Sequence, residues 1–293
     1  MTPQGRLADK VTIVTGAGTG IGEAIAHRFA REGAKVVVAG LPDDPVEDVA
    51  KAIRKAGGAA VAFGGDVSEE AQAKACVDRA LSVYGRLDVL VNNAGVFLFT
   101  GETQDYPTED FDLTVRHNIR STFLMTKYAL PHLQKTRGNV VSAGSEAGLL
   151  GIEGNTPYGG TKAWVHAFMR GVAHEQAKHG VRANSVAPGP IDTAWTHART
   201  GPMNKKMEKL VVAATPVGRR GTVEEVASVY CFLASDEASF VTGAVYSVDG
   251  GITISKGPAG LEAHKSMRRE PELELPLEHT MDGLRNKDYH SSM

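Results

Sequence analysis

Residues 11–33, "VTIVTGAGTGIGEAIAHRFAREG", hold a strand pattern, a glycine-rich turn and a helix pattern in direct succession. The β-branched run at 11–15 is typical of a strand buried on both faces. Glycines alternate through 16–22, and the next segment places apolar residues three and four apart until Gly33. The helix therefore begins at the glycine turn, with its free N–H groups and positive dipole directed beyond the end of the strand.

Such a turn has two interpretations. Glycines let the backbone approach a pyrophosphate closely, and the helix start stabilises its charge, so a dinucleotide is the natural ligand. The literal G-x-G-x-x-G pattern is absent, however, because Ile21 stands where its last glycine would fall. A tight turn without a ligand is the alternative, and the rest of the sequence must decide.

The alternation of strand and helix patterns continues along the chain. Helical periodicity returns at 46–58, 71–85 and 162–180. Right-handed crossovers between such units build a doubly wound α/β fold, in which helices cover both faces of a parallel sheet and ligands bind beyond the carboxyl ends of the strands. The remaining strand patterns lie at 36–39, 60–63, 89–92, 139–143, 182–187 and 245–249.

Composition excludes several classes of function. The 293 residues carry a formal net charge of −2 with scattered basic side chains, so no nucleic-acid partner is expected. Cys76 and Cys231 lie far apart without a second thiol nearby, which argues against disulfides and thiolate metal sites. Neither a signal peptide nor a long uncharged apolar run is present, so we expect a cytoplasmic protein without membrane contact.

The stretch 155–168, "NTPYGGTKAWVHAF", places Tyr158 four positions before Lys162. Residues four apart share one face of a helix, so the Lys162 ammonium can lie near the phenol. A free tyrosine has a pKa of about 10. A nearby cation lowers that pKa because it favours the phenolate, and Tyr158 thereby becomes a usable acid/base near neutral pH.

Seven motifs, in this order and spacing, resemble those of the short-chain dehydrogenase/reductase family. The resemblance spans residues 5–251, and it implies a single Rossmann-type domain over 1–251 with a seven-stranded parallel sheet, commonly in a homotetramer or homodimer. Residues 252–293 are then a C-terminal extension. The motifs are "TGAGTGIG" (15–22), "GDV" (65–67), "NNAG" (92–95), Asn118, Ser145, "YGGTK" (158–162) and "APGPIDT" (187–193).

The resemblance implies hydride transfer between a secondary alcohol or ketone and a nicotinamide cofactor. Tyr158 would exchange the substrate proton as general acid/base, and Ser145 would hydrogen-bond the substrate oxygen. Lys162 would also grip the nicotinamide ribose, and Asn118 would position a water for proton exchange. Taken singly, each residue has an ordinary structural explanation, and only their joint spacing supports the catalytic interpretation.

The same resemblance assigns the cofactor contacts but leaves the choice between NAD and NADP open. Gly40 and Leu41 occupy the positions of the acid that holds the ribose and of the arginine that meets a 2′-phosphate. Thr19 lacks the positive charge that NADP-dependent relatives often carry, so NAD is favoured, and Asp43 or Asp44 could reach back to the ribose. The expected contacts are Gly16, Gly18, Thr19, Gly20, Ile21, Gly22, Leu41, Asp66, Val67, Asn93, Ala94, Gly95, Tyr158, Lys162, Pro188, Gly189, Ile191 and Thr193.

We expect the substrate to be a medium-sized, partly hydrophobic secondary alcohol or ketone, and we expect no metal. The loop at 194–214 should close over it, and Glu146 could bond a second oxygen. A dinucleotide-binding regulator without catalysis and an epimerase or dehydratase of nucleotide sugars are the alternatives. The catalytic motif opposes the first, and the short C-terminal extension opposes the second. Candidate substrate contacts are Ser145, Glu146, Leu150, Tyr158 and Trp195.

The C-terminal extension departs most from the family pattern. Leu273, Leu275 and Leu277 alternate with glutamates, and prolines oppose a helix there. An extended arm that packs on a neighbouring subunit is one interpretation. A solvated, disordered tail is the other.

Overall fold

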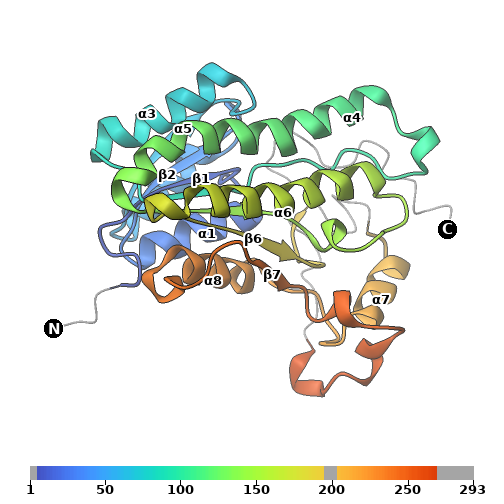
Figure 1. The fold of residues 1–293 in the computed structure, drawn as a ribbon. Coiled ribbons are helices and arrows are strands. Elements are labelled where there is room, and N and C mark those ends of the chain that lie inside the picture. Colours follow the sequence, from blue (N-terminus) through green and yellow to red (C-terminus); the bar gives the residue numbers. More distant parts are fainter. Residues whose placement is uncertain (1–4, 195–202, 269–293) are drawn as a thin grey trace.

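A computed structural model describes residues 5–194 and 203–268, and its centre is one parallel sheet (Figure 1). Within this described part the sheet has seven strands in the order β3-β2-β1-β4-β5-β6-β7. The direction of winding changes between β1 and β4, which creates a crevice at the carboxyl ends of the strands. The predicted α/β fold is confirmed. The strands are β1 (Val11–Thr15), β2 (Lys35–Gly40), β3 (Ala59–Gly64), β4 (Val89–Asn92), β5 (Asn139–Ala143), β6 (Arg182–Pro188) and β7 (Val245–Val248).

Helices cover both faces of the sheet because alternate strand residues point to opposite sides. Val14 packs with helices α1, α2 and α8, whereas Ile13 packs with α3, α5 and α6. Figure 1 shows α1 and α8 on the side of the sheet opposite α3 and α5. The helices are α1 (Gly20–Arg31), α2 (Val46–Lys55), α3 (Glu70–Tyr84), α4 (Thr108–Val115), α5 (Ser121–Thr136), α6 (Thr156–Gln176), α7 (Lys205–Ala214) and α8 (Val223–Ala234).

A π-helical turn at Arg116–Arg120 joins α4 to α5. Such turns are rare in proteins and occur often at functional sites. This one contains Asn118, whose side chain is buried and directed at the loop after β4. The local widening of the helix therefore places a motif residue that periodicity alone could not position.

Between β7 and residue 268 the chain forms short helical turns. Asp249 accepts hydrogen bonds from the backbone N–H groups of Gly251 and Thr253, which fixes the direction in which the chain leaves the sheet. The 3₁₀ turn at Ala259–Glu262 then packs against α7. The predicted leucine arm at 273–277 lies outside the described residues. Among the described helices, none is long and apolar enough to cross a membrane.

We predict that Gly22→Ala destabilises the fold. A Cβ at position 22 would lie 2.0 Å from the Gly16 carbonyl oxygen, so the turn or the start of α1 would have to move. The free energy of unfolding should fall by about 1–3 kcal/mol. Gly171→Ala in α6 is the matched control, because a Cβ there meets nothing within 4 Å, and a helical alanine should add up to about 1 kcal/mol. Chemical denaturation measures both, and equal effects would contradict the prediction.

Candidate active site

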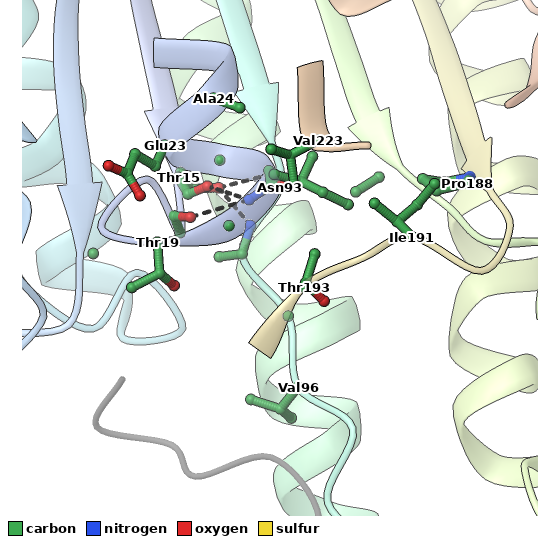
Figure 2. A pocket seen from close by; sticks show the side chains of 18 of the residues that line it. Thr15, Thr19, Glu23, Ala24, Asn93, Val96, Pro188, Ile191, Thr193 and Val223 are labelled. Atoms are coloured by element: carbon green, nitrogen blue, oxygen red, sulfur yellow. Dashed lines mark hydrogen bonds between the residues drawn. The ribbon is translucent and has the colours of Figure 1, made fainter. Parts of the chain in front are cut away.

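A cavity of about 730 Å³ opens at the carboxyl ends of the strands. Figure 2 shows that its wall combines the glycine turn, the loop after β4 and the segment after β6. Of the predicted cofactor contacts, all but Gly18 line this cavity. They are Gly16, Thr19, Gly20, Ile21, Gly22, Leu41, Asp66, Val67, Asn93, Ala94, Gly95, Tyr158, Lys162, Pro188, Gly189, Ile191 and Thr193.

Gly18 is the exception, and packing explains it. A Cβ on Gly18 would lie 3.1 Å from the Asp44 Cβ and 3.2 Å from the Pro45 ring. The residue therefore supports the loop after β2 from behind and does not line the described cavity. Its glycine identity serves close packing between two loops.

The glycine turn is held rigidly against β4. The Asn93 side chain donates to the carbonyls of Thr15 and Gly16, both at 3.1 Å. The Thr15 hydroxyl in turn accepts from the N–H groups of Asn93 and Ala94 at 3.0 Å (Figure 2). Thr15, the first residue of the glycine-rich motif, also lines the cavity, although it was not among the predicted cofactor contacts.

This turn fits a pyrophosphate. Gly22 sits so close to Gly16 that any side chain would fill the space between the turn and α1. The N-terminus of the 12-residue helix α1 then supplies free N–H groups and a positive dipole at the cavity wall. The residues present are thus those that a dinucleotide requires at this place.

Tyr158 and Lys162 lie on the first turns of α6, where the sequence predicts a shared face. Lys162 is buried, its Nζ donates to the Ala143 carbonyl at 3.0 Å, and it lies 5.5 Å from the centre of the Tyr158 ring. The Phe97 ring packs against Tyr158 with 4.9 Å between ring centres. The Tyr158 phenol and the Lys162 ammonium therefore lie at the same end of the cavity, with the apolar Phe97 ring beside the phenol.

Burial dominates the titration of this pair. It lowers the pKa of Lys162 to about 8. It also raises the pKa of Tyr158 to about 12, while the hydrogen bond with the Ser145 hydroxyl acts in the opposite direction. The sequence predicts that Lys162 lowers the pKa of Tyr158, but desolvation is the largest influence on this pKa and raises it. Further positive charge near the phenol is needed to form the phenolate at neutral pH.

Ser145 lies two residues beyond β5 and is fixed by a histidine. Its hydroxyl accepts from the Ala147 N–H at 3.2 Å. The His166 ring lies with Nε2 3.1 Å from the Ser145 carbonyl and with Nδ1 2.9 Å from the Ser185 hydroxyl. Burial lowers the pKa of His166, and a neutral ring with its proton on Nε2 satisfies both partners. The sequence analysis missed His166, although its spacing of four from Lys162 on α6 was a usable signal.

Asn118 is buried behind the cavity wall. Its Oδ1 accepts from the Val96 N–H at 2.7 Å, and its Nδ2 donates to the Val96 carbonyl and to the Thr161 hydroxyl, both at 3.0 Å. Thr161 bonds the Tyr158 carbonyl at 2.7 Å. The side chain of Asn118 therefore connects the loop after β4 to the first turn of α6, and its predicted part in proton exchange stays a prediction.

The candidate substrate contacts differ in their placement. Glu146 directly follows Ser145, and its Oε2 is buried with no hydrogen-bond partner among the described residues. Burial, with a contribution from Asp249, raises the pKa of Glu146 to about 7. Leu150 is 41% exposed and does not line the cavity, so its predicted substrate contact is not seen. Trp195 lies outside the described residues.

Two further residues escaped the sequence analysis. Tyr230 of α8 is fully buried and lines the cavity, and its hydroxyl has no hydrogen-bond partner within the described part of the chain. Arg220 is buried between Asp192, at 3.0 Å, and Glu208 of α7, at 3.1 Å. Neither residue belongs to a motif, and only the three-dimensional arrangement reveals them.

Known proteins are similar to this chain in sequence. The family model described as enoyl-(acyl carrier protein) reductase matches residues 16–253. Meso-2,3-butanediol dehydrogenase of Serratia marcescens is 38% identical over 252 residues, which cover 86% of this chain and 98% of that protein. The matches establish common descent over nearly the whole length of this relative.

Solved structures agree. The crystal structure of levodione reductase superposes with a TM-score of 0.81 at 32% identity, covering 85% of this chain and all of that one. A 7α-hydroxysteroid dehydrogenase complexed with NADH and 7-oxo-glycochenodeoxycholic acid gives 0.79 at 34% identity, over 84% and 95% of the two chains. The chain belongs to the short-chain dehydrogenase/reductase family.

Proposed function

We propose that this NAD(P)-dependent oxidoreductase interconverts a secondary alcohol and a ketone with Tyr158 as the proton-transferring residue. The observation that carries the proposal is the convergence of Tyr158, Lys162 and Ser145 on the cavity that also holds the glycine turn. The nicotinamide supplies hydride exchange and, when oxidised, a positive charge. NAD is the preferred cofactor in this proposal, because the cavity-lining residues Thr19 and Leu41 are both uncharged.

The chain's residues divide the proton chemistry. During oxidation the Tyr158 phenolate oxygen takes the hydroxyl proton of the alcohol, and the Ser145 hydroxyl donates a hydrogen bond to the oxygen on which charge develops. Lys162 places positive charge behind the phenol ring. His166 holds the Ser145 backbone, so it is a positioning residue in this scheme. During reduction Tyr158 returns the proton.

The rival is a dinucleotide-binding protein without catalysis. The relative and the solved structures compared above are named as dehydrogenases or reductases, which does not favour it. The burial of Lys162 opposes it as well. Burying a lysine is costly, and ribose binding alone does not explain why this buried lysine lies 5.5 Å from the centre of a buried phenol ring.

We predict that Tyr158→Phe abolishes turnover and spares cofactor binding. Loss of a positioned acid/base should lower kcat by at least about 100-fold. Titration of the protein's tryptophan fluorescence with NADH should give a nearly unchanged Kd. In the wild type, oxidation should accelerate as pH rises, because the base acts deprotonated and the pKa of Tyr158 is raised to about 12 by burial. Most of the wild-type rate in Tyr158→Phe would refute the mechanism.

We further propose that the substrate carries a second polar group beside the reacting carbon. Glu146 is next to Ser145, although it does not itself line the described cavity. Its Oε2 is buried with no hydrogen-bond partner in the described part of the chain, and the carboxyl group interacts electrostatically with Tyr158. A carboxyl group with a pKa near neutrality can both donate to and accept from a hydroxyl. Vicinal diols and hydroxyketones therefore suit the site better than simple alcohols, and the similarity to a butanediol dehydrogenase supports this class.

Variants of Glu146 test this. Glu146→Leu should lower kcat/KM for a vicinal diol by about tenfold or more while changing that for the matching mono-alcohol far less. Glu146→Gln keeps a donor and an acceptor and should retain the diol preference. Equal losses for both substrates in Glu146→Leu would contradict the proposal.

The same carboxyl group also predicts a pH-dependent stability. Burial raises its pKa from 4.5 to about 7, so the folded protein binds the proton more tightly than the unfolded chain between these values. Stability from this group is therefore present below pH about 4.5 and is lost as pH rises through about 7. Glu146→Gln should become more stable than the wild type over this range, by up to about 3 kcal/mol. A constant difference across pH would contradict the assignment.

We also propose that residues 1–251 form the catalytic domain of a homodimer or homotetramer and that 252–293 is an extension to it. The described start of the extension packs on α7, which belongs to the segment 194–214 that we expect to cover the substrate. The leucines at 273–277 would then be available for a neighbouring subunit. The extension would thus contact the substrate-covering segment of its own subunit at one end and a neighbouring subunit at the other.

Two truncations separate these roles. A chain ending at Arg268 keeps the turn that packs on α7, whereas one ending at Lys256 lacks it. We expect the shorter chain to raise the KM for the alcohol without changing the Kd for NADH, and both truncations to weaken the oligomer in sedimentation. If both truncated proteins match the full chain in sedimentation, melting temperature and kinetics, the extension is passive.

A further inference from the structure

We propose that Asp44 takes the place of the missing acid at the end of β2, binds the ribose hydroxyls of the adenosine half of the cofactor, and thereby selects NAD over NADP. The inference rests on the proposed function, because it concerns the same cavity. In dinucleotide-binding folds that acid normally ends the second strand. Here β2 ends at Gly40, and the next residue is Leu41.

The loop after β2 returns Asp44 to the end of the strand. The Asp44 N–H bonds the Leu41 carbonyl at 3.1 Å, which closes a four-residue turn with Pro42 in the second position. The Asp44 Oδ2 then accepts from the Leu41 N–H at 2.8 Å. Both bonds hold the carboxylate over the strand end, where the side chain is buried and lines the cavity.

Gly40 makes room for this carboxylate. A Cβ at position 40 would lie 2.9 Å from Asp44 Oδ2 and 2.7 Å from the Val46 side chain. The space in which an acid at position 40 would begin is thus the space that Asp44 fills. A side chain at 40 and the observed place of Asp44 exclude each other.

Gly18 supports the same arrangement from the other side. Its missing Cβ would be 3.1 Å from the Asp44 Cβ. Asp44 therefore lies between the glycine turn and the end of β2, where the ribose of a dinucleotide bound at that turn must pass. Gly18, Gly40 and Asp44 form one steric unit, which accounts for two glycines that cofactor contacts alone do not explain.

The chemistry of a carboxylate gives the selectivity. It accepts hydrogen bonds from two ribose hydroxyls, whereas a 2′-phosphate replaces one of these donors with negative charge. Arg116, on the far side of Asp66, is engaged in ion pairs with Asp66 at 3.0 Å and with Glu69. The 2′-phosphate of NADP would therefore be repelled by the Asp44 carboxylate.

Asp44→Asn tests the proposal, with Asp43→Asn as the matched control. Asp43 is the preceding residue, carries the same charge and is exposed. We expect Asp44→Asn to raise the Kd for NAD by about tenfold or more and to reduce the preference over NADP, since hydrogen bonds to charged groups are the strong ones. Asp43→Asn should change neither Kd by more than about twofold. Isothermal titration with both dinucleotides gives these values without turnover.

A rescue variant guards against a simple loss of packing. Gly40→Asp combined with Asp44→Ala and Val46→Ala removes the two closest contacts of a side chain at position 40, with Val46 Cγ1 and Asp44 Oδ2, and returns the acid to the strand. This variant should regain the NAD preference that Asp44→Ala with Val46→Ala loses. Thermal denaturation should show that all variants fold. Equal effects of Asp43→Asn and Asp44→Asn, or a wild type that prefers NADP, would overturn the inference while leaving the oxidoreductase intact. A wild type that binds neither dinucleotide would instead refute the proposed function.

Discussion

The side chain of Asn93 joins the glycine turn to the rest of the site, and the geometry of the site depends on that junction. It donates to Thr15 and Gly16, so the turn cannot move independently of β4. Just beyond, Val96 is held by Asn118, and Asn118 bonds Thr161 on the first turn of α6. Thr161 reaches the Tyr158 carbonyl. A line of hydrogen bonds thus connects the expected pyrophosphate site to the acid/base.

Rigidity of this kind matters because the two ends of the cavity serve one reaction. Hydride and proton leave neighbouring atoms of the substrate. The nicotinamide and the phenol must therefore be held in fixed positions relative to each other, to within a fraction of an ångström. Short hydrogen bonds from side chains to backbone groups hold both ends of the cavity in place. An ion pair between two long side chains on the surface could not hold the site in this way, since each side chain would retain several rotamers.

Burial sets the pKa values of the two titratable groups at the centre of the site. Desolvation pushes the pKa of Lys162 down to about 8 and that of Tyr158 up to about 12, so both groups resist charge when considered with the protein alone. A cationic ring bound beside them favours the phenolate and thereby couples acid/base competence to the oxidised cofactor. Bound oxidised cofactor would lower the pKa of Tyr158, so that more of the tyrosine would be deprotonated and able to accept the substrate proton when the hydride acceptor is in position.

The sequence predicted the fold and the main wall of the site because both follow from local patterns. Strand 11–15, the glycine turn and the spacing of Tyr158 and Lys162 are each set by residues close together in the chain. His166 and Asp44 were harder, since their partners depend on side-chain direction and on the shape of a turn. The predicted substrate contact of Leu150, which is exposed and does not line the described cavity, stays a prediction, because an apolar residue in a loop has no period that distinguishes pocket from surface.

Arg220 illustrates what no pattern could have indicated. Its partner Asp192 lies just before the segment 194–214 that is expected to close over the substrate, and its partner Glu208 lies within that segment. A buried ion pair is weak support for stability, because desolvation offsets most of the attraction, but removing one partner leaves an uncompensated charge. Separating Arg220 from Asp192 or Glu208 therefore costs more free energy than forming the ion pairs contributes to stability. Asp192 lines the cofactor cavity next to Thr193, so a shift of α7 would disturb the cofactor wall, and the two movements are coupled through a single guanidinium group.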